Sequence, residues 1–209
     1  MNKELENILI KVGDLYNKYG IKSVTMDDVA RELGISKKTL YQFVENKGDL
    51  VSKVLKNTLS KNNCTFKEID EKNQNAIDEL LEVGKHIVKI ITKYNHSLEY
   101  DLKKYYPLLY DQIHEMRKEK MYNSILNNIL KGKKEGLYRS DMNEEIITKI
   151  QTSRFVHMSS GELFDPEDIN KPQYILELFI YHIRGIATIK GIDVLEKKLL
   201  NTDIQEYLQ

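Results

Sequence analysis

The chain of 209 residues has only one cysteine, three prolines and no excess of either charge, with 32 basic and 32 acidic residues. The single cysteine, Cys64, rules out an internal disulfide and fits the reducing cytoplasm, where we expect the protein to act. No apolar run approaches the roughly 20 residues that a membrane-spanning helix needs, and the polar start MNKELEN is unlike a signal peptide. Zero net charge argues against a general nucleic-acid coat protein.

Motifs for catalysis and cofactor binding are also missing. The five histidines are scattered without metal-ligand spacing, and Cys64 has no second cysteine to share a metal. Gly132-Lys133 lacks the earlier glycine of a phosphate-binding loop, and neither a G-x-S-x-G elbow nor a dinucleotide-binding glycine pattern occurs. The sequence therefore predicts a protein that is not an enzyme and that holds no cofactor or metal.

The scarcity of helix breakers, together with long 3.6-residue periodicities, predicts an all-α protein. A polar, mixed stretch over residues 63–72 predicts a joint, and the chain closes on a weak helix. Apolar stripes predict the main helices over residues 4–19, 46–62, 74–94, 97–104, 107–134, 143–160 and 172–190.

Residues 25–47 carry the most specific pattern, which predicts a helix, a glycine turn and a second short helix. Thr25 is a suitable N-cap, and Asp28 stands three residues later, where a capping box places its acid. Gly34 permits a positive φ and so ends the first helix. Ser36 is the next N-cap. This spacing is typical of a helix-turn-helix, whose second helix lies in the DNA major groove.

The second helix of this motif is polar on its outer side. Leu40 and Phe43 point back at the core, because they lie three residues apart. Many helical hairpins with a glycine turn do not bind DNA, so the turn alone leaves both interpretations open. The residues that remain for the outside are Lys37, Lys38, Thr39, Tyr41 and Gln42.

In combination, the motifs of the first quarter of the chain resemble the DNA-binding domain of the tetracycline-repressor (TetR-like) family. The resemblance implies a three-helix helix-turn-helix domain over residues 1–50 and a helical bundle for ligand binding and dimerisation over residues 51–209. The matching motifs are Tyr19-Gly20-Ile21, Ser23-Val24-Thr25, Val29-Ala30, Leu33-Gly34-Ile35-Ser36, Thr39-Leu40-Tyr41, Asn46-Lys47 and Leu50.

The same resemblance implies roles for individual residues. Lys37 and Lys38 are expected nearest the base edges, with Gln42 as a further candidate, and lysine can donate to guanine O6 and N7. We therefore expect a homodimeric, ligand-responsive regulator, most simply a repressor, that binds a palindromic DNA operator and a small-molecule effector. The residues that match phosphate-gripping positions are Thr25, Thr39, Tyr41 and Lys47.

Residues 172–190 are apolar around nearly the whole helix, apart from a narrow stripe that holds Glu177 and Arg184. Such a helix is buried on two faces. It is either a central core helix or, as the resemblance favours, part of a dimer interface together with residues 143–160. In the second case Ile183 and Ile186 are candidate contacts to the partner.

The middle of the chain is rich in tyrosine, which offers an apolar face and one hydroxyl to an aromatic or amphipathic ligand. Ordinary packing between helices explains any single tyrosine equally well. The candidate effector contacts are Tyr94, His96, Tyr100, Tyr106, Tyr110, His114 and Tyr122.

Two other functions compete with a regulator. A small α-helical enzyme with an incidental helix-turn-helix needs a convergent acid–base constellation, which the sequence lacks. A nucleoid-type protein that binds DNA without sequence preference is disfavoured by the neutral overall charge.

Overall fold

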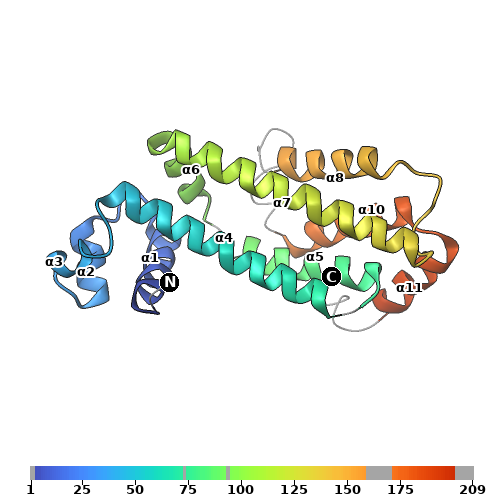
Figure 1. The fold of residues 1–209 in the computed structure, drawn as a ribbon, viewed down its shortest axis with the longest axis horizontal. Coiled ribbons are helices and arrows are strands. Elements are labelled where there is room, and N and C mark those ends of the chain that lie inside the picture. Colours follow the sequence, from blue (N-terminus) through green and yellow to red (C-terminus); the bar gives the residue numbers. More distant parts are fainter. Residues whose placement is uncertain (1–2, 73, 93–94, 159–170, 201–209) are drawn as a thin grey trace. The chain divides into compact units, whose positions relative to one another are not determined.

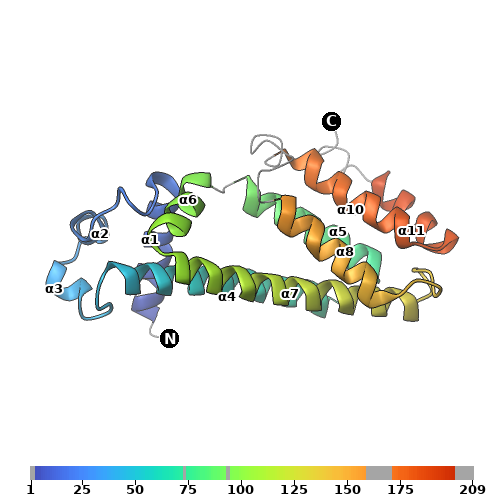
Figure 2. The same ribbon diagram turned by 90° about the horizontal axis from the view of Figure 1, so that it is seen from above.

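The computed structural model describes residues 3–72, 74–92, 95–158 and 171–200, and within these ranges the structure is helical apart from turns and one isolated bridge between Tyr138 and Ala187 (Figures 1 and 2). The predicted all-α fold is confirmed. The helices are α1 (Lys3–Tyr19), α2 (Met26–Leu33), α3 (Lys37–Leu40), α4 (Lys47–Glu71), α5 (Ala76–Ile91), α6 (His96–Tyr105), α7 (Pro107–Lys134), α8 (Glu144–Met158), α10 (Pro172–Ile186) and α11 (Ile189–Leu199).

Helix α4 is longer than the sequence predicted, because the expected joint at residues 63–72 is almost entirely helical. Two apolar side chains in this stretch are packed. Phe66 meets the ring of His86 edge-on, with 5.0 Å between the ring centroids, and Ile69 is buried. The mostly polar composition of this stretch therefore did not indicate that Phe66 and Ile69 pack and so stabilise the end of the helix.

Helix α10 is shorter than predicted and ends at Ile186 instead of residue 190. Ala187 has extended backbone angles, with φ −73° and ψ 150°. The backbone N–H of Thr188 donates to Leu137 O at 2.8 Å, and the Thr188 hydroxyl caps α11 by accepting from Gly191 N. Pairing with a distant segment thus ends α10 and starts α11.

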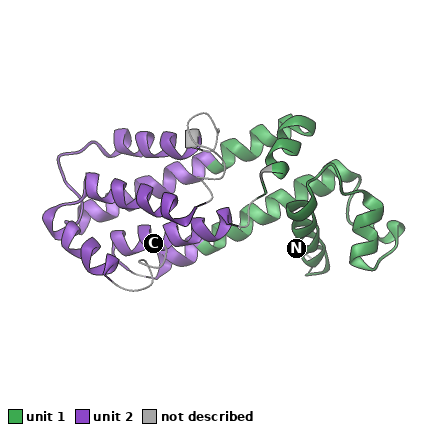
Figure 3. Cartoon of the chain, turned by 180° about the vertical axis from the view of Figure 1, so that it is seen from behind, with its two compact units in different colours: residues 1–65, 94–117 green, residues 66–93, 118–209 purple. Residues whose placement is uncertain are grey.

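The chain forms two compact units (Figure 3). Unit 1 comprises residues 1–65 and 94–117, and unit 2 comprises residues 66–93 and 118–209. Unit 1 therefore contains α6 and the first turns of α7 as well as the helix-turn-helix. The functional division at residue 50 stays a prediction, because compactness and function are different properties.

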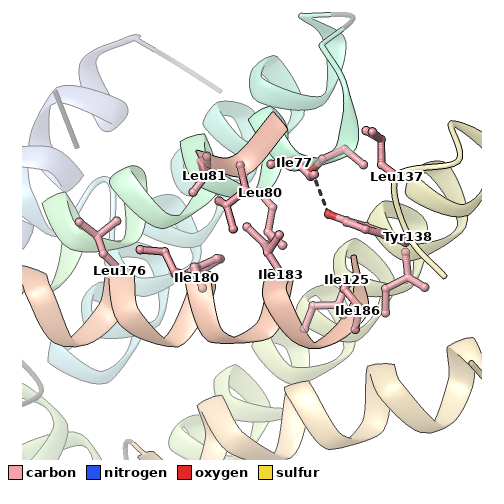
Figure 4. Packing of buried hydrophobic residues seen from close by; sticks show 14 of the residues in the cluster. Ile77, Leu80, Leu81, Ile125, Leu137, Tyr138, Leu176, Ile180, Ile183 and Ile186 are labelled. Carbon is pink, nitrogen blue, oxygen red and sulfur yellow. Dashed lines mark hydrogen bonds between the residues drawn. The ribbon is translucent and has the colours of Figure 1, made fainter. Parts of the chain in front are cut away.

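The core of unit 2 is built by α5 packing on α10 (Figure 4). Gly84 permits a close approach, since a Cβ at this position would lie 3.3 Å from the ring of Phe179. Ile183 and Ile186 are 0% and 3% exposed within the single chain. The core-helix interpretation is therefore correct for these two side chains, and neither is available to a partner.

Unit 2 also contains a buried hydrogen-bond network centred on Asn128 of α7. Its amide donates to Ala76 O at 2.9 Å and to Glu79 Oε1 at 2.8 Å, and its oxygen accepts from the Tyr138 hydroxyl at 3.0 Å. The same hydroxyl reaches Ala76 O (Figure 4), and Lys131 pairs with the second oxygen of Glu79. The network joins the start of α5, the end of α7 and the segment that follows α7.

This network predicts a large cost for Asn128→Ala, which leaves Glu79 and the Tyr138 hydroxyl short of partners in a buried site. Each buried polar group without a partner costs roughly 1–3 kcal/mol. We expect the free energy of unfolding, measured by urea titration, to fall by about 2–4 kcal/mol. The neighbouring Asn127 is exposed, so Asn127→Ala is the matched control and should change stability by less than about 0.5 kcal/mol. Equal effects of both variants would contradict the assignment.

Candidate DNA-binding site

The first helix of the predicted motif, α2, begins with a complete capping box. Thr25 Oγ1 accepts from Asp28 N at 3.2 Å, and Asp28 Oδ2 accepts from Thr25 N at 3.0 Å. The Thr25 hydroxyl also donates to Asp28 Oδ2 at 2.6 Å, and this bond, together with the one from the Thr25 backbone N–H, lowers the pKa of the Asp28 carboxyl. Gly34 ends the helix with φ 67°, in the left-handed region. The local chemistry predicted from the sequence is therefore confirmed at both ends of α2.

The second helix, α3, is a single turn that is held in place by its cap and by one core residue. Ser36 Oγ accepts from Thr39 N at 3.0 Å. Leu40 is fully buried, which fixes the side of the helix that faces the core. The residues of α3 and of the turn after it that remain exposed are Lys37, Lys38, Tyr41 and Gln42. Thr39 is half-buried, and its hydroxyl bonds to Ser36 Oγ at 2.8 Å.

The lysines of this surface differ in their surroundings. Lys37 Nζ lies 2.8 Å from Asp27 Oδ2 of α2, whereas Lys38 is exposed. Lys47, at the start of α4, is partly buried, and its Nζ donates to Lys22 O at 3.3 Å. This burial lowers the pKa of the Lys47 ammonium.

The sequence-predicted DNA-binding residues lie on or directly beside α2, α3 and the start of α4, which all belong to unit 1 and are labelled in Figures 1 and 2. Lys37, Lys38, Thr39, Tyr41 and Gln42 all lie on or directly after α3. Thr25 caps α2, and its capping partner Asp28 interacts electrostatically with Lys47. The surface combines three cations with hydroxyl and amide groups, which are the donors that phosphates and base edges accept from.

Sequence reasoning missed the contact between α6 and the loop that leads into α2. Asp101 of α6 is 8% exposed and accepts from the Lys22 backbone N–H at 2.8 Å. At the start of α6, Asn95 Nδ2 donates to Asn17 O at 2.8 Å. These contacts join residues almost 80 positions apart in the chain, and no sequence spacing signals them.

Among the predicted effector contacts, most of those that the structure describes lie in unit 1. Tyr106 and Tyr110 pack partly buried against its core, and Tyr100 is 60% exposed. The rings of Tyr110 and His114 stack with their centroids 5.8 Å apart. The structure therefore brings Tyr110 and His114 together, without placing Tyr100 in a buried site.

The remaining predicted contacts are not gathered with this group. Tyr122 belongs to unit 2 and is half-buried. Tyr94 and the side chain of His96 lie outside the described residues. The assignment of an effector pocket to these side chains stays a prediction.

Helix α8 in unit 2 has buried polar and exposed apolar side chains that the sequence did not reveal. Thr148, Gln151 and Thr152 are buried, whereas Ile146 and Ile150 are 56% and 53% exposed. The buried hydroxyl of Thr152 has no hydrogen-bond partner among the described residues. The helix thus turns several polar side chains inward and leaves Ile146 and Ile150 outside, while Ile147 and Phe155 pack partly buried against the core of unit 2.

Helix α10 contributes to both sides of this arrangement. His182 is 7% exposed, and burial lowers its pKa to about 4, so its imidazole is neutral at pH 7. Tyr181 is 67% exposed and lies under the guanidinium of Arg154 from α8, at 5.0 Å from the ring centroid. The outer sides of α8 and α10 therefore adjoin in a partly apolar surface.

The described part of the chain shows neither a membrane-spanning helix nor a cluster of metal ligands. No helix there is long and apolar enough to cross a membrane. No group of three or more histidine, cysteine, aspartate or glutamate side chains within the same ranges is arranged to hold a metal ion.

Comparison with known proteins agrees with the geometry of unit 1. Residues 14–54 match the family described as "Bacterial regulatory proteins, tetR family". The chain is 26% identical over 150 residues to the HTH-type transcriptional regulator SAB2452 of Staphylococcus aureus, a match that covers 72% of this chain and 74% of the relative.

Solved structures share the fold. A transcriptional regulator from Cytophaga hutchinsonii aligns with a TM-score of 0.75 at 16% identity, covering 90% of this chain and 100% of that one. A gamma-butyrolactone receptor (ArpA-like protein) aligns with a TM-score of 0.63 at 14% identity, covering 90% and 91% of the two chains. At these identities the similarity establishes the fold alone.

Proposed function

We propose that this protein, whose residues 14–54 match the DNA-binding domain of the tetR family of bacterial regulatory proteins, is a homodimeric transcriptional repressor. It binds a palindromic operator in the cytoplasm and releases it when a small-molecule effector binds. The observation that carries this proposal is the exposed polar side of α3, which is held outward by the buried Leu40. We assign no catalytic role, because the family and the curated relatives are regulators.

On DNA, α3 enters the major groove and the residues divide into two roles. Lys37 and Lys38 donate to base edges, assisted by Gln42, and so read the sequence. The phosphate-gripping residues fix the register without reading sequence. They are Thr25, Thr39, Tyr41 and Lys47.

The partly apolar outer surface of α8 and α10 supports the homodimer. Ile146 and Ile150 of α8 and Tyr181 of α10 are large apolar residues that the single chain leaves more than half exposed. A two-fold symmetric contact buries this patch on both subunits at once. The two-fold axis then demands an operator whose half-sites are one helical turn of DNA apart, about 34 Å, or a multiple of it.

The polar inner side of α8 supports the effector site. A buried hydroxyl without a partner is costly, and a ligand that donates to or accepts from Thr152 removes that cost. Neutral His182 and Gln151 add further polar groups on the buried sides of α10 and α8. The tyrosine set of the sequence remains a second candidate for effector contact. The domain division at residue 50 belongs to the same proposal.

Contacts within unit 1 can transmit a conformational change caused by the effector to the surface proposed to bind DNA, which consists of the candidate residues on α3 and at the starts of α2 and α4. Asp101 of α6 holds the loop before α2, and Lys47 contacts the same loop at Lys22 O. A shift of α6 therefore changes the seating of residues that grip DNA. The effector achieves this only by favouring one arrangement of the helices over another.

We expect substitution of Lys47 and of Lys38 to change DNA binding in two distinguishable ways. Lys47→Ala should weaken binding to all duplexes about equally and lower the salt slope by roughly one per site, because it removes a phosphate contact. Lys38→Ala should change which sequence is preferred. Band shifts on a duplex enriched from a randomised library and on a scrambled duplex, over a range of salt, measure both. A wild-type protein that binds both duplexes alike would instead indicate a non-specific DNA-binding protein.

The dimer surface predicts that Ile150→Glu yields monomers, because a symmetric contact would bury both introduced carboxylates without partners. Sedimentation equilibrium at micromolar concentration should show a dimer for the wild type and a monomer for the variant. Leu108→Glu is the control, since Leu108 is 78% exposed but lies on α7 in unit 1, and it should remain dimeric. A stable wild-type monomer would contradict the proposal.

The effector site predicts opposite effects of Thr152→Val on stability and on ligand binding. Removing a buried unpartnered hydroxyl should raise the free energy of unfolding by about 1 kcal/mol, while affinity for a compound found by thermal-shift screening falls. Thr148→Val is the control, because the Thr148 hydroxyl already donates to Glu144 O at 2.7 Å, and it should lower stability.

The same compound should bind more weakly when the enriched duplex is present. A 100-fold loss of DNA affinity corresponds to about 2.7 kcal/mol of coupling, and reciprocity requires the same factor for the ligand. Equal ligand affinity with and without DNA would show that the compound does not operate a switch.

A further inference from the structure

An acidic side chain lies beside Lys37, the first residue of α3, which is the helix proposed to enter the DNA major groove. Asp27, in the first turn of α2, accepts from Lys37 Nζ at 2.8 Å, and this contact bridges α2 and α3. The hydrogen bond raises the pKa of the Lys37 ammonium. The Lys37 and Asp27 side chains are 49% and 60% exposed. The ion pair therefore belongs to the surface that carries the candidate DNA-reading residues.

The Asp27 carboxylate contributes little to the stability of the fold. The capping of α2 is complete without Asp27, because Thr25 and Asp28 make both of its hydrogen bonds. An exposed ion pair contributes little to stability. Facing DNA, a carboxylate at this position repels phosphates. Asp27 thus lowers attraction to the DNA backbone at a surface where the neighbouring lysines raise it.

We propose that Asp27 is a specificity-determining residue that holds Lys37 for a base edge and keeps it from phosphates. The inference rests on the DNA-binding function proposed above. A lysine ammonium has three donors, so Lys37 can keep one on Asp27 and still offer two to guanine O6 and N7. A phosphate that approaches Lys37 meets the charge of Asp27 at close range, whereas a base edge carries no net charge. Asp27 therefore weakens binding to arbitrary DNA more than binding to the matching sequence.

The substitution Asp27→Asn tests this inference on two duplexes, one enriched by the wild-type protein from a randomised library and one with the same composition in scrambled order. Freed Lys37 should neutralise one more phosphate per site on the scrambled duplex. Its log–log salt slope should steepen by about 0.9 per site, and its affinity should rise about fivefold per site at 0.15 M salt. Affinity for the enriched duplex should not rise, so the specificity ratio falls about fivefold or more.

Two further variants isolate the contact. Glu32→Gln removes the same charge from the same helix at another exposed position, and it should leave both the salt slope and the specificity ratio unchanged. In a Lys37→Gln background, Asp27→Asn should raise affinity for the scrambled duplex less than it does in the wild type, because the part of the effect that operates through Lys37 is lost and only the direct repulsion of phosphates by Asp27 is removed. Thermal unfolding of each variant verifies that the fold is retained.

Three results would overturn the inference: no change in Asp27→Asn, an equal rise on both duplexes, or the same rise in Glu32→Gln. A wild-type protein that binds neither duplex overturns the proposed function itself and the inference with it. Sequence-specific binding by the wild type together with an unchanged specificity ratio in Asp27→Asn overturns only the inference.

Discussion

The buried carboxylate of Asp101 is the interaction on which the arrangement of unit 1 depends. It accepts from the Lys22 backbone N–H at 2.8 Å, and only 8% of the residue is exposed. A buried carboxylate that loses a hydrogen-bond donor is left unsatisfied where little water can replace it, so this bond helps to hold α6 and the loop before α2 together. Lys47 Nζ donates to the backbone carbonyl oxygen of the same residue, Lys22. The helix-turn-helix, the start of α4 and α6 therefore form one connected body.

The sequence predicted the features that depend on chemistry within four residues. The capping box of Thr25 and Asp28 and the cap of α3 at Ser36 are local contacts, so residue type and spacing are sufficient to find them. Contacts between residues far apart in the sequence could not be predicted from it. The bond of Asp101 to Lys22 joins positions 79 apart, and the partner of Lys37 depends on how α2 and α3 pack. The end of α10 was misplaced for the same reason, because Thr188 pairs with distant Leu137.

Helix α8 follows the rule that apolar side chains face inward only in part, since Ile147 and Phe155 pack against the core whereas other apolar residues do not. Its buried polar residues are partly satisfied within the helix, since Thr148 donates to Glu144 O and Gln151 accepts from Arg154. Its apolar residues Ile146 and Ile150 remain outside. In our proposal the inner side meets the effector and the outer side meets the second subunit. One rigid helix then links ligand binding to the geometry of the dimer, without a longer chain of contacts between the two sites.

The shortness of α3 has a consequence for how DNA preference changes during evolution. A single turn cannot sustain itself as an isolated helix, so its shape depends on the Ser36 cap and on buried Leu40. Lys38 and Gln42 are exposed, and substitutions at such positions alter stability by less than about 0.5 kcal/mol. The residues that maintain the turn are thus separate from those that read the DNA sequence in our proposal. If these residues read DNA as we propose, single substitutions that leave folding intact can change the preferred operator, so this surface is a starting point for retargeting the protein to other DNA sites.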